Sequence, residues 1–305
     1  MRFDEQVAVI TGAGAGLGRA YAIALAERGA HVALIDAGIA DPNAVLTQDS
    51  GLIKTAQTLT ELGAQTLSFK LDVRDSVGLN DAVKTILARW GHIDIVINNA
   101  SIHRPCAFED LSYAQWQQQL DIDVNGSFML TKLVWPEMKR QGYGRILMSC
   151  GASALYGDRH ESCFSTSKMA LIGLVNSLAI EGMDSNICVN SITPHALTQM
   201  TEHHLSPLVK PLFSTSSVNA VMLFLTSTLA PTGQHLLVAA GSVSHGKFTE
   251  SQHMRITDAE CNPNVIHAHW HELKQARPYQ VHPSGEAQVT AWAKRSAGEH
   301  HIVIE

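Results

Sequence analysis

The chain has few cysteines, and their spacing offers no disulfide framework. The five cysteines, at positions 106, 150, 163, 188 and 261, are odd in number and include no Cys-x-x-Cys pair. With 305 residues, 45% of them hydrophobic, the chain is long enough to bury a core without disulfides. A small disulfide-stapled protein is therefore excluded, and reduced thiols in a reducing compartment are favoured. We expect a cytoplasmic protein.

Runs of basic residues and long apolar stretches are also missing. No run of Lys or Arg marks a phosphate-tracking surface, and the formal net charge is -6, so we expect no nucleic-acid partner. No stretch of 18 uninterrupted apolar residues predicts a membrane-spanning helix. The N-terminus lacks the pattern of an export signal, and the final residues are not a Ser-Lys-Leu peroxisomal signal. We therefore expect no membrane association and no export.

The chain does have a regular alternation of two patterns as far as about residue 240. Short β-branched runs alternate with longer amphipathic stretches, which is typical of β-α-β units around a parallel sheet. The predicted strands are Val7–Thr11, His31–Asp36, Gln65–Lys70, Ile93–Asn98, Gly144–Ser149, Asn186–Ile192 and His235–Ala239. The predicted helices are Leu17–Arg28, Leu52–Leu62, Val77–Trp90, Ala114–Met138, Ser167–Glu181, Ser217–Leu229 and Asn264–Gln275.

These elements predict an α/β fold of the doubly wound, Rossmann type. We expect a seven-stranded parallel sheet with helices on both faces over residues 1–240, and a C-terminal extension, 241–305, packed on it. Residues 37–50 form a long polar connection after the second predicted strand. Ligands of such sheets bind beyond the carboxyl ends of the strands, where the strand order reverses.

A glycine-rich loop follows the first predicted strand and opens the first predicted helix. Its sequence is Thr11-Gly12-Ala13-Gly14-Ala15-Gly16-Leu17-Gly18. Gly12 permits the tight turn, Gly16 lets the backbone approach a pyrophosphate, and Gly18 allows close packing of helix on strand. Gly14 adds freedom to the same loop. The loop predicts a phosphate cradle, although glycines at such a junction can also be kept for folding alone.

Asp36 ends the second predicted strand, 24 positions after Gly12. A carboxylate at this place accepts hydrogen bonds from the ribose diol of adenosine and repels a 2'-phosphate. We therefore predict NAD as the cofactor, with NADP disfavoured.

The glycine loop and the segment Asn98-Asn99-Ala100 together resemble the short-chain dehydrogenase/reductase family. The resemblance implies that Asp72-Val73 meets adenine, and that Pro194 to Met200, with His195 in place of the usual glycine, brackets the nicotinamide. Ser101 stands where the family has a glycine. The cofactor-binding residues expected in this way are Thr11, Gly12, Gly14, Gly16, Leu17, Gly18, Asp36, Asp72, Val73, Asn99, Ala100, Lys168, Pro194 and Thr198.

The family's chemistry depends on a Tyr-x-x-x-Lys pair together with a serine and an asparagine. Lys168 matches the lysine, but Phe164 takes the place of the tyrosine, Gly151 that of the serine and Asp123 that of the asparagine. Phenylalanine has no group that can exchange a proton with a substrate oxygen. Other polar groups nearby could substitute; they are His160 and Tyr156 foremost, then Ser153, Cys150 and Cys163.

A second resemblance narrows the group within the family. The long connection after Asp36, segments 135–139, 143–146 and 155–157 and the Trp270 helix resemble the dehydrogenase domains of peroxisomal multifunctional enzymes, over most of residues 4–275. For catalytically intact members this implies (3R)-hydroxyacyl-CoA or steroid-like substrates, and dimers.

Three functions are compatible with these features. The favoured one is a degenerate, NAD-binding, non-catalytic subunit in a homo- or hetero-oligomer with an intact related dehydrogenase, associating through the helices Ala114–Met138 and Ser167–Glu181. One alternative is an active NAD-dependent oxidoreductase on a bulky acyl-CoA or steroid alcohol. Another is a sensor that binds NAD(H) without turnover.

The chain has sixteen histidines, which raises the question of a metal site. His267 and His271 would share one face of a helix, but spacing fixes no third ligand. We interpret the segment as an ordinary surface helix and predict no metal site.

Overall fold

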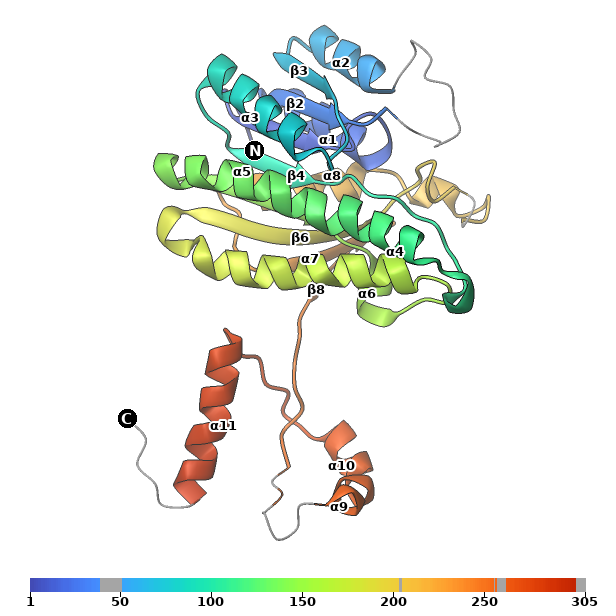
Figure 1. The fold of residues 1–305 in the computed structure, drawn as a ribbon, viewed down its shortest axis with the longest axis vertical. Helices are drawn as coiled ribbons and strands as arrows, with labels where there is room; N and C mark the ends of the chain where they lie inside the picture. The colour runs from blue at the N-terminus through green and yellow to red at the C-terminus, as the bar shows by residue number, and fades with distance from the viewer. Residues whose placement is uncertain (39–50, 203–204, 255, 257–261, 300–305) are drawn as a thin grey trace. The chain divides into compact units, whose positions relative to one another are not determined.

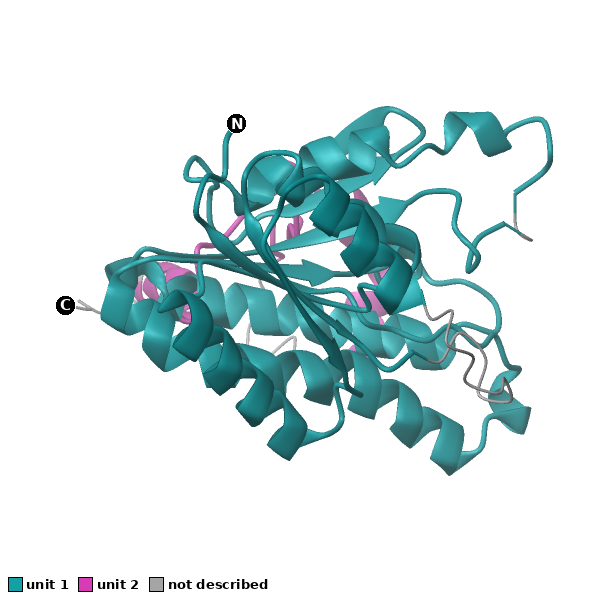
Figure 2. Ribbon diagram, turned by 90° about the horizontal axis from the view of Figure 1, so that it is seen from above, with its two compact units in different colours: residues 1–245 teal, residues 246–305 magenta. Residues whose placement is uncertain are grey.

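The computed structural model describes residues 1–38, 51–202, 205–254, 256 and 262–299, and Figure 1 shows its fold. The chain divides into two compact units, Met1–His245 and Gly246–Glu305, which Figure 2 colours separately. The division follows residue 245, where we predicted it after residue 240. The packing of the extension on the first unit stays a prediction.

The first unit is built on a sheet whose strand order is β3-β2-β1-β4-β5-β6-β7-β8. Six adjacent pairs, from β3·β2 to β6·β7, are parallel. The strands are β1 Val7–Thr11, β2 His31–Asp36, β3 Thr66–Lys70, β4 Ile95–Asn98, β5 Gly144–Ser149, β6 Ile187–His195, β7 His235–Ala239 and β8 Ser242–Gly246. The order reverses between β1 and β4, so the predicted doubly wound fold is confirmed, with its ligand-binding switch point at that place.

The eighth strand is a correction to the predicted seven. β8 follows β7 after two residues, Ala240 and Gly241, which both have positive φ. A connection of two such residues makes an antiparallel hairpin, so β8 forms an edge of the sheet. The strand escaped prediction because its sequence, Ser-Val-Ser-His-Gly, is short, polar and mostly exposed.

Helices cover both faces of the sheet. Along β1, Ala8 and Ile10 belong to one apolar cluster while Val7 and Val9 belong to another, so successive side chains enter opposite layers. Figure 1 shows the arrangement. The first layer contains α1 Gly16–Ala26, α2 Gly51–Glu61 and α8 Ser216–Thr226, and the second contains α3 Ser76–Trp90, α5 Gly126–Gln141 and α7 Ser162–Glu181.

The helix predicted over Ala114–Met138 is interrupted. Helix α4, Tyr113–Leu120, leads into a π-helical turn, η2 Asp121–Asn125, and the chain then continues as α5. Single π turns within α-helices frequently mark functional sites. Here the turn carries Asp123, whose side chain is completely buried.

Helix α7 begins at Ser162, five positions before the predicted start at Ser167, so Phe164 lies on the helix and not in the loop before it. Among the described residues, α7 is also long and apolar enough to cross a membrane by length and composition. The core helix of a folded domain passes the same test, and here Leu171, Ile172, Val175 and Ala179 pack into the core beside the sheet.

The described part of the second unit contains helices and, between Glu250 and Gln280, an isolated antiparallel bridge. The predicted helix Asn264–Gln275 is two helices, α9 Pro263–Ala268 and α10 Trp270–Gln275, divided at His269. A further helix, α11 Gly285–Glu299, was not predicted.

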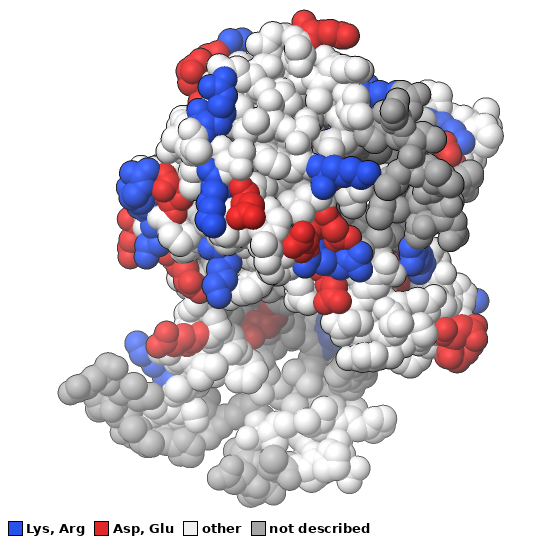
Figure 3. Space-filling model, turned by 45° about the horizontal axis from the view of Figure 1, so that its top comes forward, with Lys and Arg blue, Asp and Glu red and all other residues white. Residues whose placement is uncertain are grey.

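Most of the long connection expected over 37–50 lies outside the described residues. On the face of the protein drawn in Figure 3, acidic and basic side chains are interspersed.

Candidate nucleotide site and the eroded catalytic centre

The glycine loop has the geometry of a phosphate cradle. Gly12 has φ +64°, a conformation that favours glycine, and a Cβ at Gly18 would overlap the carbonyl oxygen of Gly12. Helix α1 therefore begins in contact with the loop, with its N-terminal N–H groups at the carboxyl end of β1. Leu17, the other predicted residue of this helix start, packs against the core of the first layer.

The carboxylate of Asp36 lies directly over the glycine loop. Its Oδ2 accepts a hydrogen bond from Gly14 N at 2.8 Å and its Oδ1 accepts one from Gly38 N at 2.7 Å. A Cβ at Gly14 would come within 3.0 Å of this carboxylate, so the glycine permits the close approach. Strand β2 thus holds a fixed negative charge beside the loop.

The end of β4 is tied to the end of β1 through Thr11. Its Oγ1 accepts hydrogen bonds from Asn99 N at 2.9 Å and from Ala100 N at 3.0 Å. Asn99 Nδ2 in turn donates to Thr11 O at 3.1 Å. These bonds keep the backbones of the two strand ends together, so the Asn-Ala segment borders the glycine loop.

Other predicted cofactor residues border the same edge of the sheet. Thr198, in the loop after β6, faces the glycine loop, because a Cβ at Gly16 would lie 3.5 Å from Thr198 Cγ2. Pro194 lies in β6, and His195 continues that strand in regular pairing with Ala239, so the missing glycine leaves the backbone undisturbed.

Asp72 and Val73 have different environments. Hydrogen bonds from Arg74 lower the pKa of the Asp72 carboxyl. Val73 is buried and packs closely on Gly126, where a Cβ would lie 2.7 Å from Val73 Cγ2. Asp72 therefore offers a fixed carboxylate at the edge, whereas Val73 anchors the segment beneath it.

The catalytic lysine of the family forms a buried ion pair in this chain. Lys168 Nζ lies 3.1 Å from Asp123 Oδ2, and the two side chains are 4% and 0% exposed. The same oxygen accepts hydrogen bonds from Ser101 Oγ at 3.1 Å, Gln119 Nε2 at 2.9 Å and Ser167 Oγ at 2.8 Å. The acid that replaces the asparagine is thus the centre of a polar network that holds Lys168 by its charge.

Phe164 and Gly151 replace the other two groups and fit against each other. A Cβ on Gly151 would lie only 2.8 Å from Phe164 Cε1, which is closer than real Cβ contacts. The ring therefore takes space that a side chain at position 151 would need. On another side Lys168 Nζ lies 5.3 Å from the centre of the Phe164 ring, close enough for a cation–π contact.

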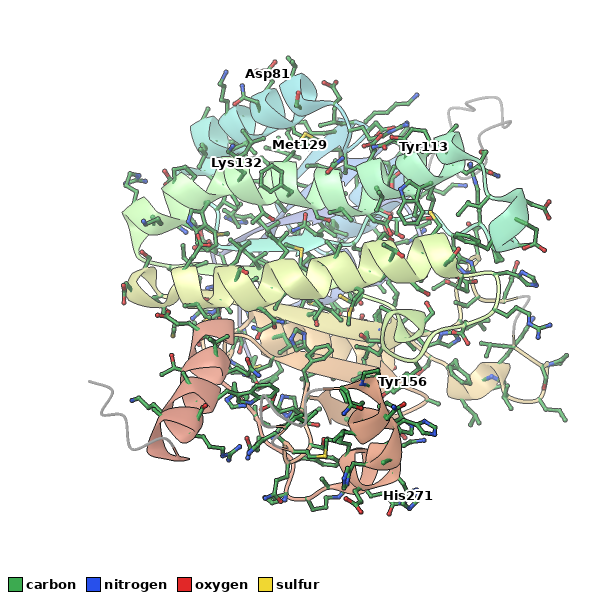
Figure 4. All side chains as sticks on the ribbon, turned by 60° about the horizontal axis from the view of Figure 1, so that its bottom comes forward. Asp81, Tyr113, Met129, Lys132, Tyr156 and His271 are labelled. Atoms are coloured by element: carbon green, nitrogen blue, oxygen red, sulfur yellow. The ribbon has the colours of Figure 1, made fainter. Side chains whose placement is uncertain are left out.

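The predicted substitutes for the tyrosine differ in exposure. Tyr156, on the short helix α6 Ala152–Tyr156 (Figure 4), is 77% exposed, and His160 is also exposed. Ser153, Cys150 and Cys163 are buried, and burial raises the pKa of the Cys150 thiol to about 11. A thiolate at Cys150 is therefore disfavoured at neutral pH.

The structure brings a pair to Phe164 that we did not predict. His103 Nε2 lies 2.7 Å from Glu161 Oε1, and the His103 ring meets the Phe164 ring edge-on, with centroids 5.0 Å apart. The two residues are 58 positions apart, so local spacing could not pair them. The available signal was topological, because His103 lies in the segment that follows the carboxyl end of β4, five positions after Asn98.

His267 and His271 of the second unit are the histidines whose spacing raised the question of a metal site. His267 lies in the last turn of α9 and His271 lies in α10, beyond the break at His269. Within the described ranges, no group of three or more His, Cys, Asp or Glu side chains is arranged to hold a metal ion.

The doubly wound sheet, the glycine loop at its switch point and the acid at the end of β2 are typical of dinucleotide-binding proteins. The sequence pattern of the short chain dehydrogenases matches residues 6–207, and the chain belongs to that family. It is 41% identical to peroxisomal multifunctional enzyme type 2 of Mus musculus over 203 residues, 66% of this chain and 27% of that protein. This similarity confirms the predicted resemblance to the dehydrogenase domains of peroxisomal multifunctional enzymes.

Two solved structures extend the comparison. Full-length peroxisomal multifunctional enzyme type 2 from Drosophila melanogaster matches with a TM-score of 0.80 and 25% identity, over 98% of this chain and 50% of that one. Carveol dehydrogenase from Mycobacterium avium in complex with NAD matches with a TM-score of 0.71 and 25% identity, over 79% and 98%. The chain thus spans about a quarter of the mouse protein and half of the fly one. The family and the NAD-bound neighbour support a nicotinamide cofactor.

Proposed function

We propose that this chain binds NAD and serves as a non-catalytic subunit of a hydroxyacyl-CoA or steroid dehydrogenase complex. One observation supports this most strongly: Phe164 takes the place of the tyrosine while Lys168 is held in a buried ion pair with Asp123. The glycine loop, Asp36 and Lys168 are retained, whereas the tyrosine, serine and asparagine positions that carry proton transfer in the family hold Phe164, Gly151 and Asp123.

The transition-state stabilisation lost with the replaced catalytic groups argues against ordinary turnover. Positioned acid–base catalysis contributes roughly 10² to 10⁴ in rate, and one oxyanion donor roughly 10² to 10³. Added together, the two losses amount to about 5 to 9 kcal/mol of transition-state stabilisation, which is an upper figure because such groups act as a unit. Hydride transfer by the family's route should therefore be close to undetectable.

The preference for NAD rests on the carboxylate of Asp36. The two oxygens are fixed by backbone N–H groups of Gly14 and Gly38, so the charge cannot swing away from an adenosine ribose. A 2'-phosphate would meet this charge at close range, whereas a ribose diol could donate to it.

Association through α5 and α7 is supported by apolar side chains left outside the core. Met169 and Ile180 of α7 are 40% and 47% exposed. On α5, whose Met129 and Lys132 are marked in Figure 4, Phe128 is 46% exposed and Lys132 Nζ lies 5.5 Å from its ring centre. Such faces suit a second copy or an intact relative.

We propose a cytoplasmic location on the grounds of thiol chemistry, although the similar enzymes named above are peroxisomal. Cys106, Cys150, Cys163 and Cys188 are all free thiols, as expected in a reducing compartment.

The test separates binding from chemistry in one preparation. NAD affinity is measured by calorimetry on the full chain, on Gly18→Ala, whose Cβ would overlap the Gly12 carbonyl, and on Gly173→Ala, a control with no atom within 4 Å of its added Cβ. We expect binding to be lost only in Gly18→Ala. NADH formation with a (3R)-hydroxyacyl-CoA and with steroid alcohols should be absent. A strictly homomeric particle from the native source with full activity would contradict the proposal.

A further inference from the structure

A groove lies at the edge of the sheet, between strand β3 and helix α3. We propose that it binds an extended acidic segment of a partner protein, which pairs with β3 as an added strand. The proposal goes beyond the proposed function and does not depend on it, because no residue that lines the groove belongs to the predicted cofactor-binding or catalytic set.

The backbone of β3 offers hydrogen-bonding groups that the sheet does not use. β3 is the first strand of the sheet order, and in the described part of the chain no strand lies on its other side (Figure 1). Asp36 of β2 is paired with Lys70, and Leu71 N donates to Asp36 O at 2.9 Å. In this parallel register, the N–H and C=O groups of Ser68 and Lys70 point away from β2. An edge with such groups is a template for another strand.

The groove beside this edge has room for side chains of an added strand. Its volume is about 360 Å³, which is within the usual range of ligand sites. Its apolar lining comes from Phe69 and Leu71, which pack on the second layer, and from Ala82 of α3. Gly78 lets α3 approach the strand closely, because a Cβ there would lie 2.3 Å from Leu71 Cδ1. One face of an added strand would therefore meet apolar side chains.

The charges of the groove select an acidic partner. Lys70 and Asp81 are the charged residues that line it. Asp81, marked on α3 in Figure 4, already pairs with Lys84, whose Nζ lies 3.5 Å from Asp81 Oδ1. Lys70 is exposed and forms no ion pair with any residue that the structure describes. The charge without a counterpart is thus positive, and a glutamate or aspartate of the partner complements it.

A simpler interpretation is that Lys70 only protects the edge, because a lysine on an edge strand hinders pairing with other chains. Protection alone does not require an apolar groove beside the strand. Phe69 and Lys70 are successive residues of β3, so their side chains point to opposite faces of the sheet. An added strand with alternating apolar and acidic residues satisfies both faces, while its main chain pairs with the edge.

The experiment titrates the full chain into short fluorescent peptides and follows their anisotropy. A peptide of alternating glutamate and valine should bind at least about tenfold more tightly than one of alternating lysine and valine, because only the first complements Lys70. Lys70→Glu should weaken binding of the glutamate peptide by at least about fivefold. Ser68→Pro removes the outward N–H and places a ring where the peptide would pair, so it should abolish binding. Lys139→Glu, at an exposed lysine of α5, is the matched charge control and should change nothing.

The peptide site would be overturned if the glutamate peptide did not bind, or if a folded Ser68→Pro variant, checked by circular dichroism, bound it unchanged. Should Ser68→Pro fail to fold, Lys70→Glu decides, and an unchanged affinity in that variant would overturn the site. Equal weakening by Lys139→Glu would mean attraction by overall charge and would also overturn it. Self-association of the unmodified chain that Ser68→Pro removes would assign the edge to a second copy instead of a partner.

Discussion

Separating Asp123 from Lys168 should be among the most damaging changes that a polar substitution can make in this protein. The two charges lie 3.1 Å apart and are almost inaccessible to water. Removing one partner of such a pair leaves an uncompensated buried charge, which typically costs about 3–5 kcal/mol. Total stabilities are typically about 5–15 kcal/mol, so either change alone should remove a large part of the folding free energy.

The assay is equilibrium unfolding in urea, applied to Asp123→Asn, Lys168→Met and the double variant. Each single variant should lose about 3–5 kcal/mol in the free energy of unfolding. The double variant leaves no unpaired charge, so its loss should fall short of the sum by at least about 2 kcal/mol. Glu137→Gln, which breaks an ion pair with the exposed Arg140, is the control and should leave the midpoint unchanged.

Additive losses would refute this reasoning, because they would mean that the two side chains stabilise the fold independently. Losses below about 1 kcal/mol for both single variants would refute it as well, since that is the range of a solvated pair.

Three further outcomes are expected. Gly151→Ser should lower the free energy of unfolding by about 1–3 kcal/mol, because the new side chain overlaps Phe164. In urea unfolding, most of this loss should be relieved in a Phe164→Ala background. An equal loss in both backgrounds would contradict the overlap. Burial, and secondarily His245, lower the pKa of His235 below its usual 6.5. As the pH falls, the His235 side chain therefore binds a proton in the unfolded chain before it does so in the folded chain. Stability should therefore fall as the pH drops below about 6.5, by up to about 1.4 kcal/mol per pH unit, and His235→Gln should flatten this dependence in unfolding curves from pH 5 to 8; an unchanged slope would count against it. Asp36→Asn should raise NADP affinity relative to NAD by about tenfold in calorimetric titrations, whereas an unchanged ratio would show that Asp36 does not select the cofactor.

The centre of the sheet was predictable because β1, β2, β4 and β5 are buried along almost their whole length and therefore stand out as apolar runs. The observed bounds of β1, β2, β5 and β7 coincide with the predicted ones. The parallel order and the switch point then follow from the alternation with helices, and the glycine loop and Asp36 follow from the strand ends. Local sequence was sufficient wherever one residue's role depends on its neighbours in the chain.

The catalytic centre was predictable only as a set of replaced residues. Nothing local indicates that Asp123 would become the partner of Lys168, because the contact joins two helices that are distant in sequence. The same holds for His103 and Glu161, which meet only after β4 and the start of α7 are in place. His160, expected together with Tyr156 as the foremost substitute, is adjacent in sequence to Glu161, the residue that contacts His103.

Because of the π turn at Asp121–Asn125, the position of Asp123 in the catalytic centre depends on the number of residues in this turn as well as on their identity. A π turn holds one residue more than an α turn, so α5 is rotated with respect to the register that α4 would impose by roughly the 100° that one α-helical residue spans. Deleting a single residue within 121–125 would restore the α register and require one half of the long helix to turn by that angle. No substitution has that effect. Insertions and deletions in this turn are therefore the mutations most able to move the acid at position 123 into or out of the centre while leaving the composition of the helix almost the same.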